Sequence, residues 1–252
     1  MKFTADVYSG DGLYGYFFKY ICDEFRNNLK EHPEILEFVK KNHVPILAKE
    51  CFTSDMMGQE LQWHKGHLRK EDVKIALRNW RDKEQNSSLG IYTEWVYRDG
   101  KIWIGSFTLQ IRSAPLCMDI CKFINDFDLY KRFLSWGVKH EMGHVLDYMN
   151  TRHGLNVDEY NAIIKRDKDE YDQYFEETAD ISPDTIEQVI ELNEKYYALT
   201  QERAANNAIG ISVSELNKID TERNKKYFNK MLTITIDQSN IRDVPKEESD
   251  EK

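Results

Sequence analysis

The chain has 252 residues, enough for one large domain or two small ones, and its 40% hydrophobic and 12% aromatic residues exclude a disordered composition. A net charge of -9 disfavours broad binding to nucleic-acid phosphates, so we expect no nucleic-acid partner. No apolar run approaches the roughly 20 residues that cross a bilayer, so we expect no membrane partner either.

The cysteines indicate a reducing compartment. Cys22, Cys51, Cys117 and Cys121 include no Cys-x-x-Cys pair, and the chain is too long for a small disulfide scaffold. The start "MKFTADVYSGDG" lacks the charged residues and apolar run of a signal peptide. We therefore expect a cytoplasmic protein, whose oligomeric state the sequence does not indicate.

The first half of the chain combines helices with a β-hairpin. Apolar residues recur at helical spacing in residues 12–42, with a break at Pro33, and residues 70–85 form a further amphipathic pattern. Residues 91–97 and 101–111 are rich in β-branched and aromatic side chains and are joined by "RDG". The Asp-Gly pair between two such runs predicts a hairpin.

The second half is helical. Residues 127–150 predict one long helix, and acidic helical patterns follow at 157–180 and 184–209, separated by "ISPD". A last helix is predicted at 213–231. The order of elements predicts an α+β fold, mostly helical, with a small β-sheet packed against the helix at 127–150.

The stretch "HEMGH" lies inside that long helix. His140 and His144 are four residues apart, which places both imidazoles on one helix face. Two nitrogens so placed can bind one Zn²⁺ at about 2.0–2.1 Å. Glu141 stands beside them, where its carboxylate can accept a proton from a zinc-activated water.

The rest of the helix supports a zinc site over a chance match. A second, apolar stripe would face the core and consists of Leu134, Val138, Met142, Val145 and Met149. Gly143 costs about 1 kcal/mol in a helix interior, so we expect some neighbour to need its space. The alternative is a buried helix with two unpaired histidines, an unfavourable choice for a core.

"HEMGH" on a helix that follows a hairpin resembles the zincin metallopeptidases. The resemblance implies a zinc-dependent endopeptidase acting on a protein or peptide substrate, with Glu141 as general base. It also implies that the strand at 101–111 forms the sheet edge along which an extended substrate binds. An ordinary place inside the sheet is the alternative for this strand.

A catalytic zinc site usually has a third protein ligand and one open position. The metzincin branch is disfavoured, because Asp147 and Asn150 stand where its pattern has glycine and histidine. Asp147 could itself bind metal, but hydrogen bonding or solvation on the helix face is the favoured role. The gluzincin branch takes a glutamate from a later helix, often in E-x-x-A-[D/N], which matches Glu176 in "EETAD" and Glu202 in "ERAAN".

Packing favours Glu202 over Glu176 as the third ligand. Ala204, Ala205 and Ala208 would let the later helix approach the first one closely, and "ERAAN" lies within a helical pattern whereas "EETAD" stops at "ISPD". "ERAAN" is also similar to the corresponding stretch of small phage-type and repressor-cleaving zincins. The alternative for either glutamate is a solvated helix face.

Further polar residues have open roles. Asn206, one turn after Glu202, is a candidate hydrogen-bond partner for a zinc-binding histidine. Tyr148 or His153 could donate a hydrogen bond to the oxyanion of peptide hydrolysis, with ordinary packing an equal alternative. The pair His64 and His67 is interpreted as surface histidines rather than a second metal site.

The predicted organisation has three parts. Residues 1–85 form a helical N-terminal region of unknown role, residues 86–236 a zincin-like metallopeptidase domain, and residues 237–252 a disordered acidic tail. The alternative function is a zincin-like binding or regulatory module without general proteolytic activity. The presence of Glu141 argues against it, because a purely structural zinc site does not need that carboxylate.

Overall fold

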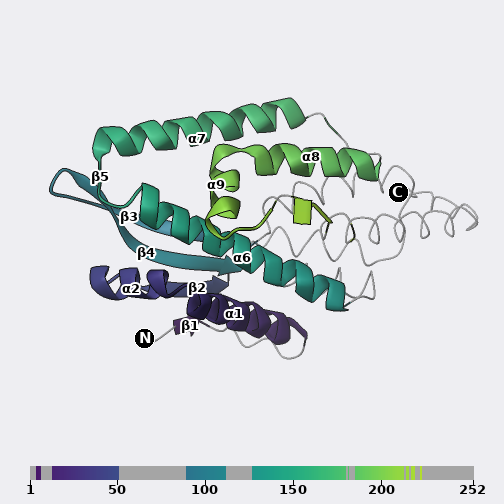
Figure 1. The fold of residues 1–252 in the computed structure, drawn as a ribbon, viewed down its shortest axis with the longest axis horizontal. Helices are drawn as coiled ribbons and strands as arrows, with labels where there is room; N and C mark the ends of the chain where they lie inside the picture. Colours follow the sequence, from purple (N-terminus) through teal and green to yellow (C-terminus); the bar gives the residue numbers. More distant parts are fainter. Residues whose placement is uncertain are drawn as a thin grey trace, which may run out of the picture.

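The computed structural model of the chain describes residues 4–6, 13–50, 89–111, 127–179, 181, 185–212, 214, 215, 217, 218 and 222. The predicted helix at 70–85, most of the one at 213–231, the tail at 237–252 and the pair His64 and His67 lie outside these residues. The described chain is an α+β fold in which helices pack around one small mixed sheet, as predicted (Figure 1).

The N-terminal part supplies two strands and two helices. Strand β1 (Thr4–Asp6) is followed by helix α1 (Leu13–Glu31), helix α2 (Pro33–Asn42) and strand β2 (Ile46–Glu50). The break at Pro33 agrees with the prediction, because proline is favoured in the first turn of a helix and ends the one before it.

The hairpin agrees with its prediction almost residue for residue. Strand β3 (Leu89–Arg98) pairs antiparallel with strand β4 (Lys101–Ile111). The two residues between them have positive φ angles, 54° at Asp99 and 74° at Gly100. This is the backbone that an Asp-Gly hairpin turn requires, and only glycine adopts it without cost.

The strand order is β1-β2-β4-β3, and the short strand β5 (Leu155–Asn156) pairs with the start of β4. Strand β2 runs parallel to β4, with Ile46 opposite Phe107, so β4 lies inside the sheet. Of the two placements left open for residues 101–111, the structure therefore shows the one inside the sheet and not the receiving edge. Within the described residues, β3 is the outermost strand on the side of the hairpin.

Four helices complete the described chain. They are α6 (Phe127–Thr151), α7 (Val157–Thr178), α8 (Ile186–Ala198) and α9 (Thr200–Ala208). The predicted helix at 184–209 is thus two helices, because Leu199 takes an extended conformation (φ -54°, ψ 141°). Figure 1 shows α6 crossing in front of the sheet, with α7 and α8 on one side of it and α1 and α2 on the other. Among the described helices, none has the length and apolar character needed to span a membrane.

One hydrophobic core joins the early and late parts of the chain. Ile21 and Phe25 of α1, Phe107 of β4, and Val138 and Met142 of α6 belong to a single buried cluster. The predicted boundary at residue 85 therefore does not separate two cores within the described residues. The apolar stripe predicted on α6 is the face that packs into this cluster.

Gly143 allows α9 to lie directly against α6. A Cβ atom at this position would lie 2.1 Å from the carbonyl oxygen of Ala205, far inside van der Waals contact. Ala205 is itself fully buried. The expectation that a neighbour needs the space at Gly143 is confirmed, and that neighbour is the backbone of α9.

Gly143→Ala tests this contact. The added methyl group must push α9 away, and we expect the loss to exceed the roughly 1 kcal/mol that alanine gains in a helix, lowering the free energy of unfolding by about 1–3 kcal/mol. Gly137→Ala is the matched control on the same helix, since its Cβ would meet only the end of the Leu89 side chain, at 3.2 Å. Urea unfolding measures both, and equal stability of the two variants would contradict the close packing of α6 on α9.

Candidate metal centre

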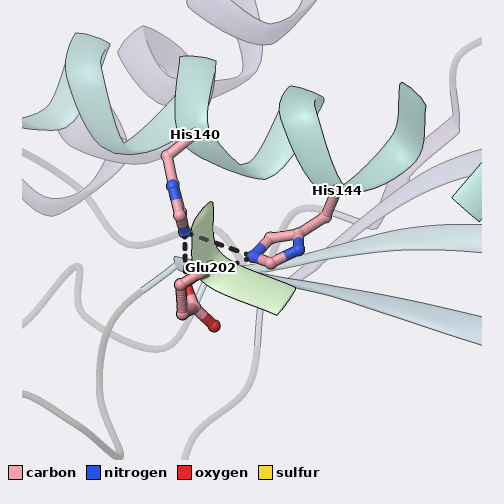
Figure 2. Close-up of side chains that lie close together, drawn as sticks. All are labelled: His140, His144 and Glu202. Atoms are coloured by element: carbon pink, nitrogen blue, oxygen red, sulfur yellow. Dashed lines mark hydrogen bonds and ion pairs between the residues drawn. The ribbon is translucent and has the colours of Figure 1, made fainter. Parts of the chain in front are cut away.

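Three side chains predicted as metal ligands lie together. His140 and His144 of α6 and Glu202 of α9 place one ligand atom each within 4.8 Å of one another (Figure 2). His140 Nε2 lies 2.8 Å from Glu202 Oε2 and 3.2 Å from His144 Nε2, and His144 Nε2 lies 3.5 Å from the same carboxylate oxygen. All three residues are buried. Their ligand atoms therefore converge on one point in the interior.

The other candidates for third ligand lie elsewhere. Glu176 is exposed near the end of α7 and does not belong to the group. Asp147 also lies outside it; its carboxylate is 3.7 Å from the Arg152 guanidinium and accepts a hydrogen bond from Thr151. Within the described residues, Glu202 is the carboxylate that joins the two histidines.

The hydrogen bonds around His140 fit a bound cation. Its Nδ1 atom lies 2.8 Å from Asn206 Oδ1, the contact expected from the sequence. Because that oxygen is an acceptor, Nδ1 carries the hydrogen, and in a neutral ring the lone pair of Nε2 faces Glu202 Oε2. Two buried acceptors at 2.8 Å require a proton or a cation between them. Two imidazoles and one carboxylate are a donor set that Zn²⁺ accepts.

Glu202 also controls the protonation of its neighbour. Burial by itself would lower the pKa of His140, but the hydrogen bond to Glu202 and the charge of that carboxylate raise the pKa to about 9. Burial would raise the pKa of Glu202, but the charges and hydrogen bonds of the two histidines hold this pKa well below its usual range. The glutamate is therefore ionised and available to a metal at neutral pH.

Glu141 lies beside the group without belonging to it. Its carboxylate is buried and accepts a hydrogen bond of 2.7 Å from the backbone N–H of Ile91 in β3. Burial raises the pKa of Glu141, against the opposing charges of His144 and His140. A buried glutamate with a raised pKa holds a proton more readily than an exposed one, which suits a general base.

Aromatic rings surround the histidines. Trp136, one turn before His140, stacks on its imidazole with ring centroids 5.4 Å apart, and Tyr197 of α8 meets the same ring edge-on at 6.0 Å. The Tyr148 ring lies 5.7 Å from that of His144. These rings exclude water from the histidine side of the group, which strengthens the electrostatic interactions there. Neither Trp136 nor Tyr197 was predicted from the sequence as part of the site.

The two predicted oxyanion donors have different surroundings. Tyr148 lies next to His144, and its hydroxyl accepts a hydrogen bond of 2.6 Å from Gln201 of α9. His153 instead accepts a hydrogen bond from the Ile104 backbone N–H through Nδ1, and its ring packs edge-on against Trp103. His153 is thus used in packing beside β4, whereas Tyr148 borders the group.

Tyr171 is a further polar residue at the site that was not predicted from the sequence. Its hydroxyl donates a hydrogen bond to Oε1 of Glu202 from helix α7. A signal was present in the sequence. The inward face of α7 is a stripe at spacings of three and four that contains three tyrosines: Tyr160, Ile163, Asp167, Tyr171, Tyr174 and Thr178.

Comparisons of the chain with protein-family models, with curated proteins and with solved structures found no match. The functional assignment therefore depends on the arrangement of His140, His144, Glu202 and their neighbours.

Metal content tests the group directly. We expect the purified chain to bind about one zinc ion, the stoichiometry of a three-ligand catalytic site. Glu202→Gln removes the charged ligand and should lose the zinc, whereas Glu176→Gln changes an exposed glutamate outside the group and should retain it. Plasma mass spectrometry after dialysis measures both. Zinc loss with Glu176→Gln alone would contradict the assignment.

The His140–Glu202 pair also predicts a pH dependence of the metal-free protein, prepared with a chelator. The folded pKa of His140, about 9, exceeds the unfolded value of about 6.5. Its contribution to stability is therefore fully present below pH about 6.5 and is lost as the pH rises through about 9. We expect a smaller loss for Glu202→Gln, whose neutral amide cannot raise this pKa. Urea unfolding at the two pH values measures it, and equal losses in both proteins would contradict the assigned role of the Glu202 charge.

Proposed function

We propose that the chain is a zinc-dependent endopeptidase that hydrolyses a protein or peptide substrate. The observation that carries this proposal is the convergence of His140, His144 and Glu202 with Glu141 directly beside them. Two imidazoles and one glutamate are the ligand set of one major class of catalytic zinc sites, which leave a further coordination position open. Zn²⁺ is the proposed cofactor because borderline nitrogen ligands with one carboxylate suit it better than magnesium or calcium.

Each residue has a separate task in the proposed reaction. Zinc held by the three ligands supplies the acidity that makes a water molecule nucleophilic at neutral pH, and it polarises a carbonyl group. Glu141 accepts the proton of that water at its carboxylate and passes it to the leaving amine. The Ile91 N–H keeps the Glu141 carboxylate in place, at 2.7 Å. Asn206 keeps the Nδ1 hydrogen on His140, so that Nε2 is free to bind metal.

The proposed substrate site is the outer edge of β3. The N–H of Ile91 is bonded to Glu141, so it points away from β4 and toward α6. In an antiparallel pair the outward-pointing residues alternate, which places Thr93 on the same edge as Ile91. An extended peptide could pair with such an edge by strand addition through groups other than the Ile91 N–H, which Glu141 already holds. The substrate would then run past Glu141 and the ligands on α6.

We also propose the kind of partner and the cellular location of the protein. The net charge of -9 supports a protein partner over nucleic acid. The cytoplasmic location proposed from cysteine usage agrees with Cys22, a buried free thiol whose pKa burial raises to about 11.

The burial of the site favours a second candidate, a zincin-like regulatory or binding module. His140 and His144 are each 6% exposed, Glu141 is 8% exposed and Glu202 is 2% exposed. A site so enclosed would act on few substrates or on one partner. A zinc-loaded, folded chain that cleaves no member of a diverse peptide library would favour this candidate.

Glu141→Gln tests the catalytic role. The amide cannot accept a proton, so we expect cleavage to fall by at least about 100-fold. Zinc content should stay at that of the unmodified chain, because Glu141 lies outside the ligand group. Mass spectrometry of a digested peptide library measures cleavage, and plasma mass spectrometry measures zinc. Glu176→Gln is the control for the same chemical change at an exposed position; retained cleavage by Glu141→Gln would disprove the mechanism.

A further inference from the structure

The two carboxylate oxygens of Glu202 have different partners. Oε2 faces the histidines, at 2.8 Å from His140 Nε2 and 3.5 Å from His144 Nε2. Oε1 accepts the hydrogen bond of the Tyr171 hydroxyl. Figure 2 shows the glutamate extending from its own helix toward the two imidazoles of α6. Only one of its oxygens is therefore directed at the place where a cation would bind.

Glu170, the residue before Tyr171 on α7, binds the backbone of α9, the helix that carries Glu202. Glu170 Oε2 accepts a hydrogen bond of 2.7 Å from the backbone N–H of Thr200, and its Oε1 accepts one of 2.8 Å from the Thr200 hydroxyl. Helix α9 begins at Thr200 and has no side-chain cap from its own N-cap residue, Leu199. Glu170 thus satisfies a free N–H at the start of α9. Two consecutive residues of α7 fix both the first turn of α9 and the ligand side chain that this turn carries.

The Oε1 hydrogen bond decides how many oxygens the glutamate can offer. A carboxylate with two free oxygens can bind a metal through one or through both. Since the Tyr171 hydroxyl occupies Oε1, turning the carboxylate to offer both oxygens would break a hydrogen bond to a charged group, which is one of the stronger kinds of hydrogen bond in proteins. We propose that Tyr171 is a positioning residue whose hydroxyl restricts Glu202 to one metal-binding oxygen, Oε2, and so keeps a coordination position open for water or substrate. This inference rests on the metal site of the proposed function.

Tyr171→Phe removes this hydroxyl with little change in packing. The Tyr171 ring lies 6.3 Å from those of Phe175 and Tyr196, and phenylalanine retains both ring contacts while losing the hydrogen bond of the hydroxyl with Tyr196. Tyr174→Phe is the matched control, because Tyr174 lies one turn further along α7 and its hydroxyl donates to the Leu192 carbonyl, 3.4 Å away, rather than to Glu202. Both variants keep every proposed metal ligand.

The first measurement is zinc affinity, from competition between the full chain and a chelating dye. Removing an outer hydrogen bond to a metal ligand typically weakens metal binding 10–100-fold. We expect Tyr171→Phe to bind zinc about 10–100-fold more weakly than the unmodified chain, and Tyr174→Phe to bind it as the unmodified chain does. The free energy of unfolding of each metal-free variant shows whether the loss is specific to the metal site.

The second measurement is the visible absorption of the Co²⁺-loaded chain, which a purely structural role of Tyr171 would leave unchanged. Cobalt absorbs strongly with four ligands and more weakly with five. Entry of the second Glu202 oxygen in Tyr171→Phe should therefore weaken the absorption, while Tyr174→Phe should match the unmodified chain. An unchanged spectrum in Tyr171→Phe would overturn the inference, whatever the zinc affinity of that variant. Failure of the unmodified chain to bind either metal would instead overturn the metal site itself, and the inference with it.

If Tyr171→Phe does not fold, a fluorine label on the tyrosine tests the same inference. Incorporation of 3-fluorotyrosine at position 171 keeps the ring and the hydroxyl. Its fluorine resonance should shift when zinc is added, because the hydroxyl is bonded to a proposed ligand. The same label at position 174 should show no comparable shift. A resonance at position 171 that is insensitive to zinc would overturn the inference.

Discussion

The close contact between α6 and α9 is the constraint on which the site depends. Packed helices are usually separated by about 8–10 Å, with side chains filling the space between them. Here the backbone of α9 at Ala205 lies against Gly143, a residue without a side chain. Gly143 stands between His140 and His144, and Ala205 lies one turn after Glu202, so the point of contact is flanked by all three ligands. A larger residue at either position would carry the carboxylate out of hydrogen-bonding distance of the imidazoles.

Helix α7 supports the site because its side chains contact both α9 and the residue just beyond the end of α6. Asp167 lies 2.8 Å from the Arg152 guanidinium, just beyond the end of α6, and both residues are buried. One turn later, Glu170 and Tyr171 hold the start of α9 and its ligand glutamate. Buried ionic and polar groups of this kind are costly unless they are paired, so the inward face of α7 can lie in few places other than the one observed. The position of Glu202 is thereby fixed by α6 on one side of α9 and by α7 on the other.

The parts of the molecule that were predicted from the sequence are those determined by residues close together in the chain. The pair His140 and His144 follows from helical spacing, and the Asp-Gly turn follows from the φ angles that only a few residues tolerate. Glu202 was favoured because its alanine neighbours permit close packing, and the structure places it beside both histidines. Its role as a zinc ligand stays a prediction.

Long-range contacts determine what the sequence analysis missed. Strand β2 has only five residues and pairs in parallel with β4, about 60 positions away, and no local signal specifies such a partner. The placement of residues 101–111 at the edge or inside the sheet stayed open for this reason, because it is β2 that pairs with the second half of β4 and places that strand inside. The break at Leu199 contains neither glycine nor proline. What the structure places at this break is a residue of α7, Glu170, which binds the N–H and the hydroxyl of Thr200.

The hydrogen bond between Ile91 and Glu141 links the proposed base to the proposed substrate edge. Glu141 is carried by α6, as are the two histidines, so its backbone is fixed relative to them. Its carboxylate is fixed relative to β3 by the Ile91 N–H. A peptide paired along β3 would be positioned by that same strand. Strand β3 would then fix both the proton acceptor and the scissile bond relative to one another. An error of about 1 Å between such groups can cost about 100-fold in rate. The rigid placement of β3 against α6, through Leu89 and Gly137 as well as through Ile91, is therefore as important to the proposed chemistry as the ligands themselves.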